Sequence, residues 1–123
     1  MKIAYSKPRF TVKFFQQEVS GSEPVRDWLK GLPIDERKAI GEDIKAAQFG
    51  WPLGLPLVDH LDGDIWEIRT KLPNRIARVL FVVDDATIVL LHGFIKKDQK
   101  TPKQELNLAK ERLKKLRGIR GIK

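Results

Sequence analysis

Cysteine is absent from this chain of 123 residues, and there are only two histidines and one tyrosine. Without cysteine, the protein cannot form disulfide bonds, use a thiol nucleophile or bind zinc through thiolates. No apolar run is long enough for a transmembrane helix, and charges interrupt the N-terminal stretch MKIAYSKPRFTVKFF, which therefore does not resemble a signal peptide. We expect a cytoplasmic protein that does not bind a membrane.

Several common enzyme motifs are lacking as well. The chain has no glycine-rich phosphate-binding loop, no HExxH and no GxSxG. His60 has Asp59, Asp62 and Asp64 nearby, but their spacing matches no familiar metal-binding motif, and we interpret them as turn and cap residues in a loop. The sequence therefore predicts neither a bound metal nor a cofactor.

Positive charge is concentrated at the C-terminal end of the chain. Residues 1–95 carry 13 Lys/Arg and 13 Asp/Glu, whereas residues 96–123 carry 11 Lys/Arg and 3 Asp/Glu, so the whole net charge of +8 lies in the last 28 residues. Such asymmetry favours a polyanion or an acidic protein as partner. The alternative is a solvated basic tail that only aids solubility.

The apolar pattern predicts a single domain that mixes helices and strands. A strand is expected at 10–16, and two helices, over PVRDWLKGLP and from 33 to about 49, form a hairpin. After a loop at 50–56, strands at 64–72, 75–84 and 86–95 are joined by connections short enough for antiparallel neighbours. The capping-box pattern TPKQ begins a basic C-terminal helix. We expect one domain at 1–117 and a flexible basic tail at 118–123.

Alternation along the predicted strands places several cations on one face of the sheet. Trp66 and Ile68 fall on one face, and Glu67 and Arg69 on the other. Arg75 and Arg78 are three residues apart and lie on opposite faces. Arg78 interrupts an apolar run and needs an anionic partner, either Glu67 or another sheet carboxylate in an ion pair, or an RNA phosphate.

His92 ends the last apolar run, on the same predicted face as Leu90 and Phe94, and is followed by a cluster of lysines. It is either a satisfied core residue or a group that exchanges protons near neutral pH. Cations and one histidine suit RNA cleavage by the 2′-hydroxyl, because that reaction needs orientation, charge stabilisation and two proton transfers. The cations that we expect to act together with His92 are Arg69, Arg78, Lys96, Lys97 and Lys100.

The stretch IWEIRTKLPNRIARVLFVVDDATIVLLHGFIKKDQKTPKQELNLAKER, residues 65–112, contains an ordered set of short motifs. They are WE[IL]R, RxxR before an apolar strand, and H[GA]FxKK followed by KTP and E[IL]xxA. In this order they resemble the phage-derived, HigB-like branch of the RelE/ParE toxin superfamily. The resemblance implies an α+β fold in which two N-terminal helices pack on a twisted antiparallel sheet of about four strands, with a basic C-terminal helix. It also implies a hetero-oligomer with a cognate antitoxin, usually of helix-turn-helix type.

RelE-like members of this superfamily cut mRNA at the ribosome, whereas ParE-like members inhibit DNA gyrase. By position, the resemblance assigns basic site residues to Arg69, Arg78 and Lys97, while the role of His92 is our inference. The C-terminal tyrosine of some RelE-like enzymes has no equivalent, because Tyr5 is the only tyrosine.

We therefore expect a metal-independent mRNA endoribonuclease that inhibits translation. The alternatives are a ParE-like gyrase inhibitor and a non-enzymatic nucleic-acid-binding module. The expected catalytic residues are Arg78, Lys97 and His92, and the expected RNA or phosphate contacts are Arg69, Arg75, Lys96, Lys100 and Lys103.

Overall fold

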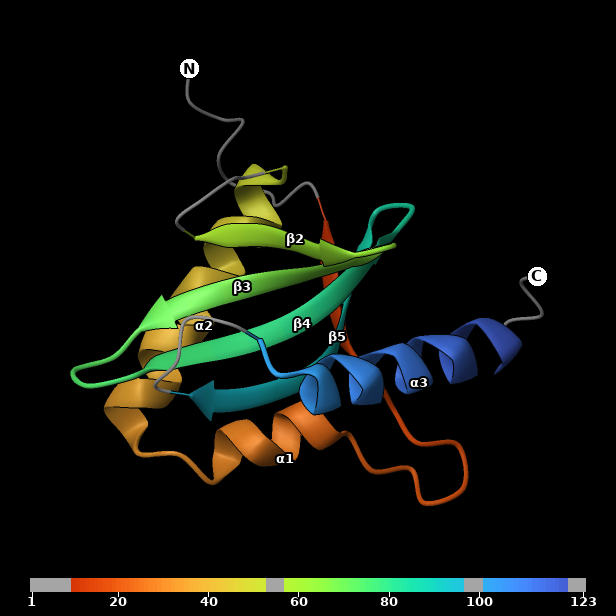
Figure 1. Ribbon diagram of the computed structural model, residues 1–123, viewed down its shortest axis with the longest axis horizontal. Coiled ribbons are helices and arrows are strands. Elements are labelled where there is room, and N and C mark those ends of the chain that lie inside the picture. The colour runs from red at the N-terminus through yellow and green to blue at the C-terminus, as the bar shows by residue number, and fades with distance from the viewer. Residues whose placement is uncertain (1–9, 53–56, 97–100, 120–123) are drawn as a thin grey trace.

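The computed structural model describes residues 10–52, 57–96 and 101–119, which form three helices and five strands (Figure 1). In chain order the elements are β1 (Thr11–Phe14), α1 (Pro24–Lys30), α2 (Ile34–Gly50), β2 (Val58–Asp62), β3 (Ile65–Lys71), β4 (Ile76–Asp84), β5 (Thr87–Lys96) and α3 (Lys103–Ile119). The predicted α+β class is confirmed, and the predicted helices and strands occur in the expected order. None of the described helices is long and apolar enough to cross a membrane.

The strands form a single sheet in the order β1-β5-β4-β3-β2. The β3–β4–β5 meander is antiparallel, as predicted, but β1 pairs with β5 in parallel. The parallel pair makes the sheet mixed. The sheet also has five strands rather than about four. The additional strand is β2, which contains His60, a residue that we had placed in a loop. Val58 packs on one face of the sheet and Leu61 on the other, because a bulge between His60 and Asp62 shifts the alternation of side chains.

Helices α1 and α2 cover one face of the sheet (Figure 1). Pro24 begins α1, and Val25, Ile40, Ile44 and Ala47 are the helical residues buried against the strands. The last three are spaced by four and three residues, so they line one side of α2. Val25, Ile40 and Ile44 each contribute about 1.5–3 kcal/mol when their side chains are removed from water. This layer is the larger of two hydrophobic cores.

Helix α3 lies across the opposite face of the sheet (Figure 1). Its apolar stripe, with Ala109 and Leu113 buried and Leu106 and Leu116 beside them, packs on a second core. Because helices cover both faces, β4 and β5 are buried on both sides, which explains their nearly continuous apolar sequences. Gly118 lies within α3, and residues 120–123 of the predicted tail are outside the described residues.

An irregularity in β5 determines where His92 points. Leu80 of β4 pairs with His92, but the next residue, Phe81, pairs with Leu90, so Leu91 is an extra residue in β5. A bulge of this kind shifts the alternation of side chains by one position. Leu90 belongs to the core under α1 and α2, whereas Leu91 and Phe94 belong to the core under α3. The prediction that His92 shares a face with Leu90 was wrong, and the prediction for Phe94 is confirmed.

Candidate active site

The predicted polar face of β3 is the face covered by α3. Trp66 and Ile68 pack into the core on the α1–α2 side, as expected from the alternation. Glu67 points to the other side, where its carboxylate meets residues of β4 and of the segment before α3. Arg69 and Lys71 follow at two-residue intervals and project from the same side. Lys71 was not among the predicted site residues.

Arg78 is buried in an ion pair with Glu67. Its Nη1 lies 3.0 Å from Glu67 Oε2, and both side chains are 1% exposed. The Thr101 hydroxyl donates to Glu67 at 2.5 Å and accepts a hydrogen bond from Arg78 at 3.2 Å. Of the two partners considered for Arg78, the structure therefore shows the sheet carboxylate. A side chain with this burial does not touch RNA in this conformation.

His92 lies in a second polar cluster under α3. Its Nε2 is 2.5 Å from Glu105 Oε1, and its Nδ1 is 3.2 Å from Arg112 Nη1. Arg112 also donates to the Leu91 carbonyl at 2.9 Å, and the imidazole stacks on Phe94. Both ring nitrogens of His92 thus have partners on α3.

The environment of His92 favours its neutral form. Burial lowers the pKa of His92 below its usual value; Glu105 opposes this shift, and the positive charge of Arg112 adds to it. A guanidinium only donates hydrogen bonds, so Nδ1 of His92 must be the acceptor and Nε2 must carry the proton. His92 is therefore held as the Nε2–H tautomer, which donates to Glu105.

The end of the sheet beyond the start of α3 carries exposed and half-buried cations. Arg69 pairs with Arg78 across the sheet, and one step further Lys71 pairs with Ile76, which pairs with Lys96. Lys96 is two residues after Phe94 and therefore points to the same side of the sheet as Arg69 and Lys71. Two interstrand spacings separate Lys71 from Lys96, so their backbones are about 10 Å apart. We call Arg69, Lys71 and Lys96 the cationic sheet end.

The structure does not bring all the predicted contact residues together. Arg75 lies on the α2 side, where its Nη2 is 2.6 and 2.7 Å from the two carboxylate oxygens of Glu36. Lys103 is exposed at the first residue of α3. Lys97 and Lys100 lie outside the described residues.

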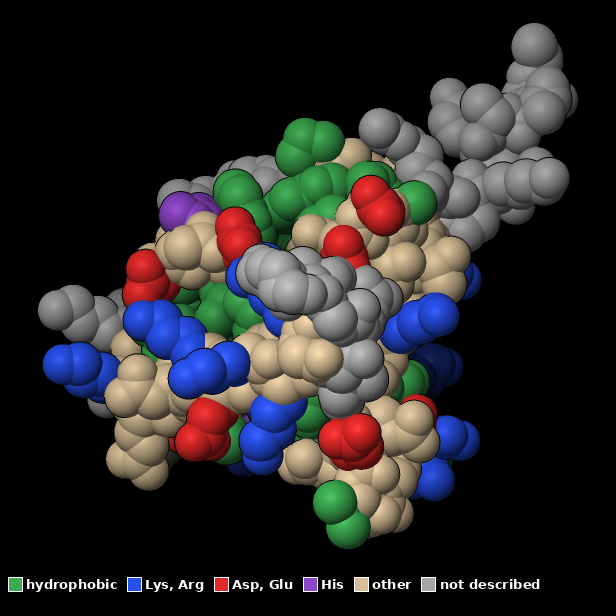
Figure 2. Space-filling model, turned by 90° about the vertical axis from the view of Figure 1, so that its right-hand side faces the viewer, with side chains coloured by type: hydrophobic (Ala, Val, Ile, Leu, Met, Phe, Trp, Pro, Cys, Tyr) green, Lys and Arg blue, Asp and Glu red, His purple; other side chains and the backbone are tan. Residues whose placement is uncertain are grey.

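Other charged side chains of α3 are tied to the β2–β3 turn. Lys110 forms an ion pair with Asp62, and Arg117 with Asp64, at 2.5 and 2.6 Å. Figure 2, which views this end of the molecule, accordingly shows blue Lys and Arg side chains interspersed with red Asp and Glu side chains. The excess charge of the C-terminal segment is thus partly balanced on this side. Within the described ranges, no group of three or more His, Asp or Glu side chains could hold a metal ion.

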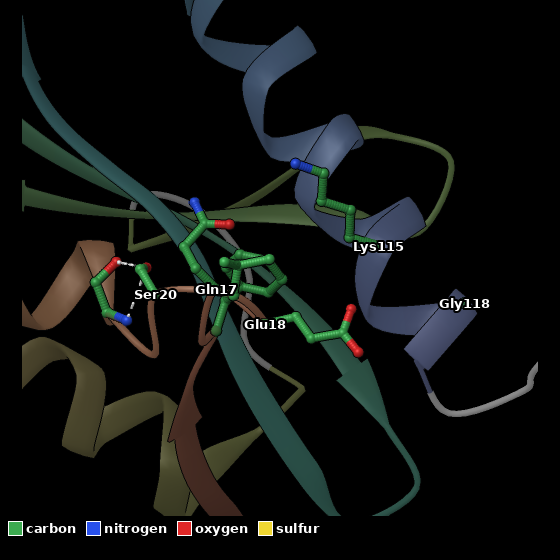
Figure 3. Close-up of a pocket in the computed structure, with 8 residues that line it drawn as sticks. Gln17, Glu18, Ser20, Lys115 and Gly118 are labelled. Carbon is green, nitrogen blue, oxygen red and sulfur yellow. Dashed lines mark hydrogen bonds between the residues drawn. The ribbon is translucent and has the colours of Figure 1, made fainter.

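A cavity of about 700 Å³ lies between the loop after β1 and the C-terminal half of α3 (Figure 3). Its lining includes Gln17, Glu18, Ser20 and Lys115, and the Ser20 hydroxyl is hydrogen-bonded to Ser22 inside it. None of the predicted site residues that the structure describes lines this cavity. It is separate from the cationic sheet end.

Residues 27–114 match the model of the phage derived protein Gp49-like family. The chain belongs to this family. The Gp49-like chain is also 33% identical over 104 residues to the protein named probable endoribonuclease HigB1 from two strains of Mycobacterium tuberculosis, CDC 1551 / Oshkosh and ATCC 25618 / H37Rv. In both cases the match covers 85% of this chain and 82% of the relative. The resemblance to the HigB-like branch, noted from the motifs, is confirmed.

Thr101, Glu105 and Arg112 of the Gp49-like chain are partners of the sheet residues that were not predicted from the sequence. Their spacing of four and seven residues was a usable signal, because it places all three on one side of a helix. We assigned Thr101 to a helix cap, whereas its hydroxyl contacts the buried pair of Glu67 and Arg78.

Proposed function

We propose that this Gp49-like protein is the toxin of a type II toxin–antitoxin system and cleaves mRNA at the ribosome. The observation that carries the proposal is the cationic sheet end, where Arg69 and Lys71 of β3 and Lys96 of β5 project from one side of the sheet, on either side of β4. The similarity to a protein named probable endoribonuclease over most of both chains supports it independently. A row of cations of this kind suits a phosphodiester backbone.

The proposed reaction is attack of the RNA 2′-hydroxyl on the adjacent phosphate. Cations beside the phosphate stabilise the extra negative charge of the transition state, and the surface orients the strand for in-line attack. Arg69, Lys71 and Lys96 serve as phosphate contacts, together with Lys103 and with Lys97 and Lys100 from the sequence prediction. The reaction as proposed uses only these cations and proton transfer.

Arg78 has a positioning role in this proposal. Its guanidinium holds Glu67, and Glu67 holds the Thr101 hydroxyl, so the pair fixes the segment that begins α3 against the sheet. The beginning of α3 in turn borders the cationic sheet end. Arg78 thus supports the site from below rather than by contact with RNA.

The proposed partners are the ribosome with its mRNA and a cognate antitoxin. A hetero-oligomer with a helix-turn-helix antitoxin accords with the HigB-like relationship. An acidic antitoxin surface would complement the cationic sheet end and cover it, which would block access to RNA.

The test is primer extension on mRNA after the chain is synthesised in a cell-free translation system. We expect discrete cleavage sites in ribosome-bound mRNA, and a rate about 100-fold lower when Arg69 and Lys96 are both replaced by alanine. Lys45→Ala is the matched control, because Lys45 is an exposed lysine of α2 on the opposite side of the sheet. Intact mRNA together with inhibition of DNA gyrase would overturn the assignment and favour the ParE-like alternative.

A further inference from the structure

The contacts of His92 leave it without a free ring nitrogen for proton transfer. Arg112 donates a hydrogen bond to Nδ1, and Glu105 Oε1 accepts a hydrogen bond from the protonated Nε2 at 2.5 Å. A proton-transfer group needs direct access, or access through one water molecule, to the atom that it deprotonates. With both nitrogens engaged by α3, His92 does not meet that requirement, and the proton must move to another group.

Glu105 is better placed to receive it. Its side chain is 27% exposed, compared with 13% for His92, so it is the more accessible member of the pair. Glu105 is one helical turn after Thr101, whose hydroxyl contacts Glu67 and Arg78 at the inner border of the cationic sheet end. Among the described residues, no side chain hydrogen-bonds its second oxygen, Oε2.

We propose that Glu105 is the general base of the nuclease and that His92, held by Arg112, is the residue that positions the Glu105 carboxylate. This assignment rests on the proposed endoribonuclease function. The Nε2–H of His92 fixes Glu105 Oε1, which leaves Oε2 as the oxygen that can accept a proton from the substrate. Arg112 keeps His92 in the tautomer that can donate in this way.

The charges around Glu105 are compatible with this role. From β5 it faces Nε2 of His92, and from α3 the guanidinium of Arg112 lies behind the imidazole. From β3 and β4, Glu67 and Arg78 neutralise each other in their buried ion pair. Glu105 therefore lies beside the proposed phosphate-binding surface, where its carboxylate can accept the proton of a 2′-hydroxyl.

The reaction balances without a further reactant. The proton of the 2′-hydroxyl moves to Glu105 Oε2 as the bond between the 2′-oxygen and phosphorus forms and the bond between phosphorus and the 5′-oxygen breaks. The leaving 5′-oxygen takes a proton from water, and the hydroxide that remains takes the proton from Glu105. The products are an RNA end with a 2′,3′-cyclic phosphate and an RNA beginning with a 5′-hydroxyl.

The test compares Glu105→Gln and Glu105→Asp in single-turnover cleavage of ribosome-bound mRNA between pH 6 and 8. Both variants can accept the hydrogen bond of His92, but only aspartate can accept a proton. We expect glutamine to lower the cleavage rate by at least about 100-fold, the lower range for loss of a general base. The residual rate of the Glu105→Gln variant should rise about tenfold per pH unit, because hydroxide then replaces the carboxylate as the base. The aspartate variant should retain more activity, without that steep rise.

Glu111→Gln is the matched control, because Glu111 is an exposed carboxylate on the same helix. Equal losses in the glutamine and aspartate variants, or a glutamine variant with the pH profile of the unmodified protein, would overturn the role of Glu105. Absence of RNA cleavage by the unmodified protein would instead overturn the proposed function itself. Nitrogen-15 NMR of His92 in the unmodified protein is independent of whether the variants fold. An Nε2–H imidazole at neutral pH supports the proposal, and an imidazolium contradicts it.

Discussion

Gly93 allows the indole ring of Trp28 in α1 to lie directly on β5. A Cβ atom at position 93 would be 2.3 Å from Trp28 Cε3, which is far inside van der Waals contact. We expect Gly93→Ala to lower the free energy of unfolding by about 1–3 kcal/mol, as overpacking of a core does. Urea denaturation measures the change. The control is Gly41→Ala, where a Cβ meets nothing within 4 Å and alanine should stabilise α2. Equal effects of the two substitutions would contradict this packing.

Arg78 illustrates why an alanine substitution can mislead in this protein. Arg78→Ala leaves the 1% exposed Glu67 charge without its partner, and we expect the free energy of unfolding to fall by about 3–5 kcal/mol. Loss of activity would then report unfolding rather than chemistry. The double variant Glu67→Leu with Arg78→Met removes both charges at similar volume and should be more stable than Arg78→Ala alone. Denaturant midpoints decide the matter, and a double variant that is no more stable would be inconsistent with a costly unpaired charge.

His92 should make the stability of the fold depend on pH. In the unfolded chain its pKa is near the usual 6.5, whereas burial lowers it in the folded protein. The unfolded state therefore binds more protons as the pH falls below about 6.5, and the free energy of unfolding decreases toward the lower folded pKa. The urea midpoint should be lower at pH 5.5 than at pH 7.5, and His92→Gln should reduce that difference. The exposed His60 supplies the control, since His60→Gln should leave the difference in place.

At the scale of secondary structure, α3 is held mainly by its apolar stripe and not by its ion pairs. Leu113 is 8% exposed in the second core, and we expect Leu113→Ala to lower the free energy of unfolding by about 2–5 kcal/mol. Asp62→Asn, which removes the solvent-exposed pair with Lys110, should change the denaturation midpoint much less. Thermal unfolding of the two variants gives the comparison. The reverse order would mean that α3 is held by charge.

The helices and the three central strands could be predicted because each has a local apolar period. The position of His92 could not, because the bulge at Leu91 arises from its pairing with β4, which no local pattern in β5 reveals. The sequence left two kinds of partner open for Arg78, a sheet carboxylate and an RNA phosphate. It could not decide between them, since strand alternation gives the face of a side chain but not its depth of burial. The contacts of Glu105 depend on how α3 docks on the sheet. Docking of this kind is a tertiary property that its own amphipathic pattern does not encode.

For the molecule as a whole, the neutral body and the basic C-terminal segment predict salt-dependent binding of RNA. Three α3 cations, Lys110, Arg112 and Arg117, contact side chains or carbonyls of the sheet and its turns, so only part of the +8 charge is directed to a partner. The logarithm of the RNA-binding constant should fall linearly with the logarithm of salt concentration. Each phosphate contact contributes a slope of about 0.7 for a single strand.

Lys96 and Lys110 differ in that Lys96 belongs to the proposed site, whereas Lys110 is paired within the scaffold. Lys96→Ala should reduce the salt slope by about 0.7 and weaken binding to different RNA sequences by similar factors, because a phosphate contact carries no base information. Lys110→Ala should leave the slope nearly unchanged, because Asp62 already balances that charge. Fluorescence anisotropy with a labelled RNA oligonucleotide at several salt concentrations measures both slopes. If Lys110→Ala lowered the slope as much as Lys96→Ala, RNA would bind along α3, and the cationic sheet end would not be the nucleic-acid interface.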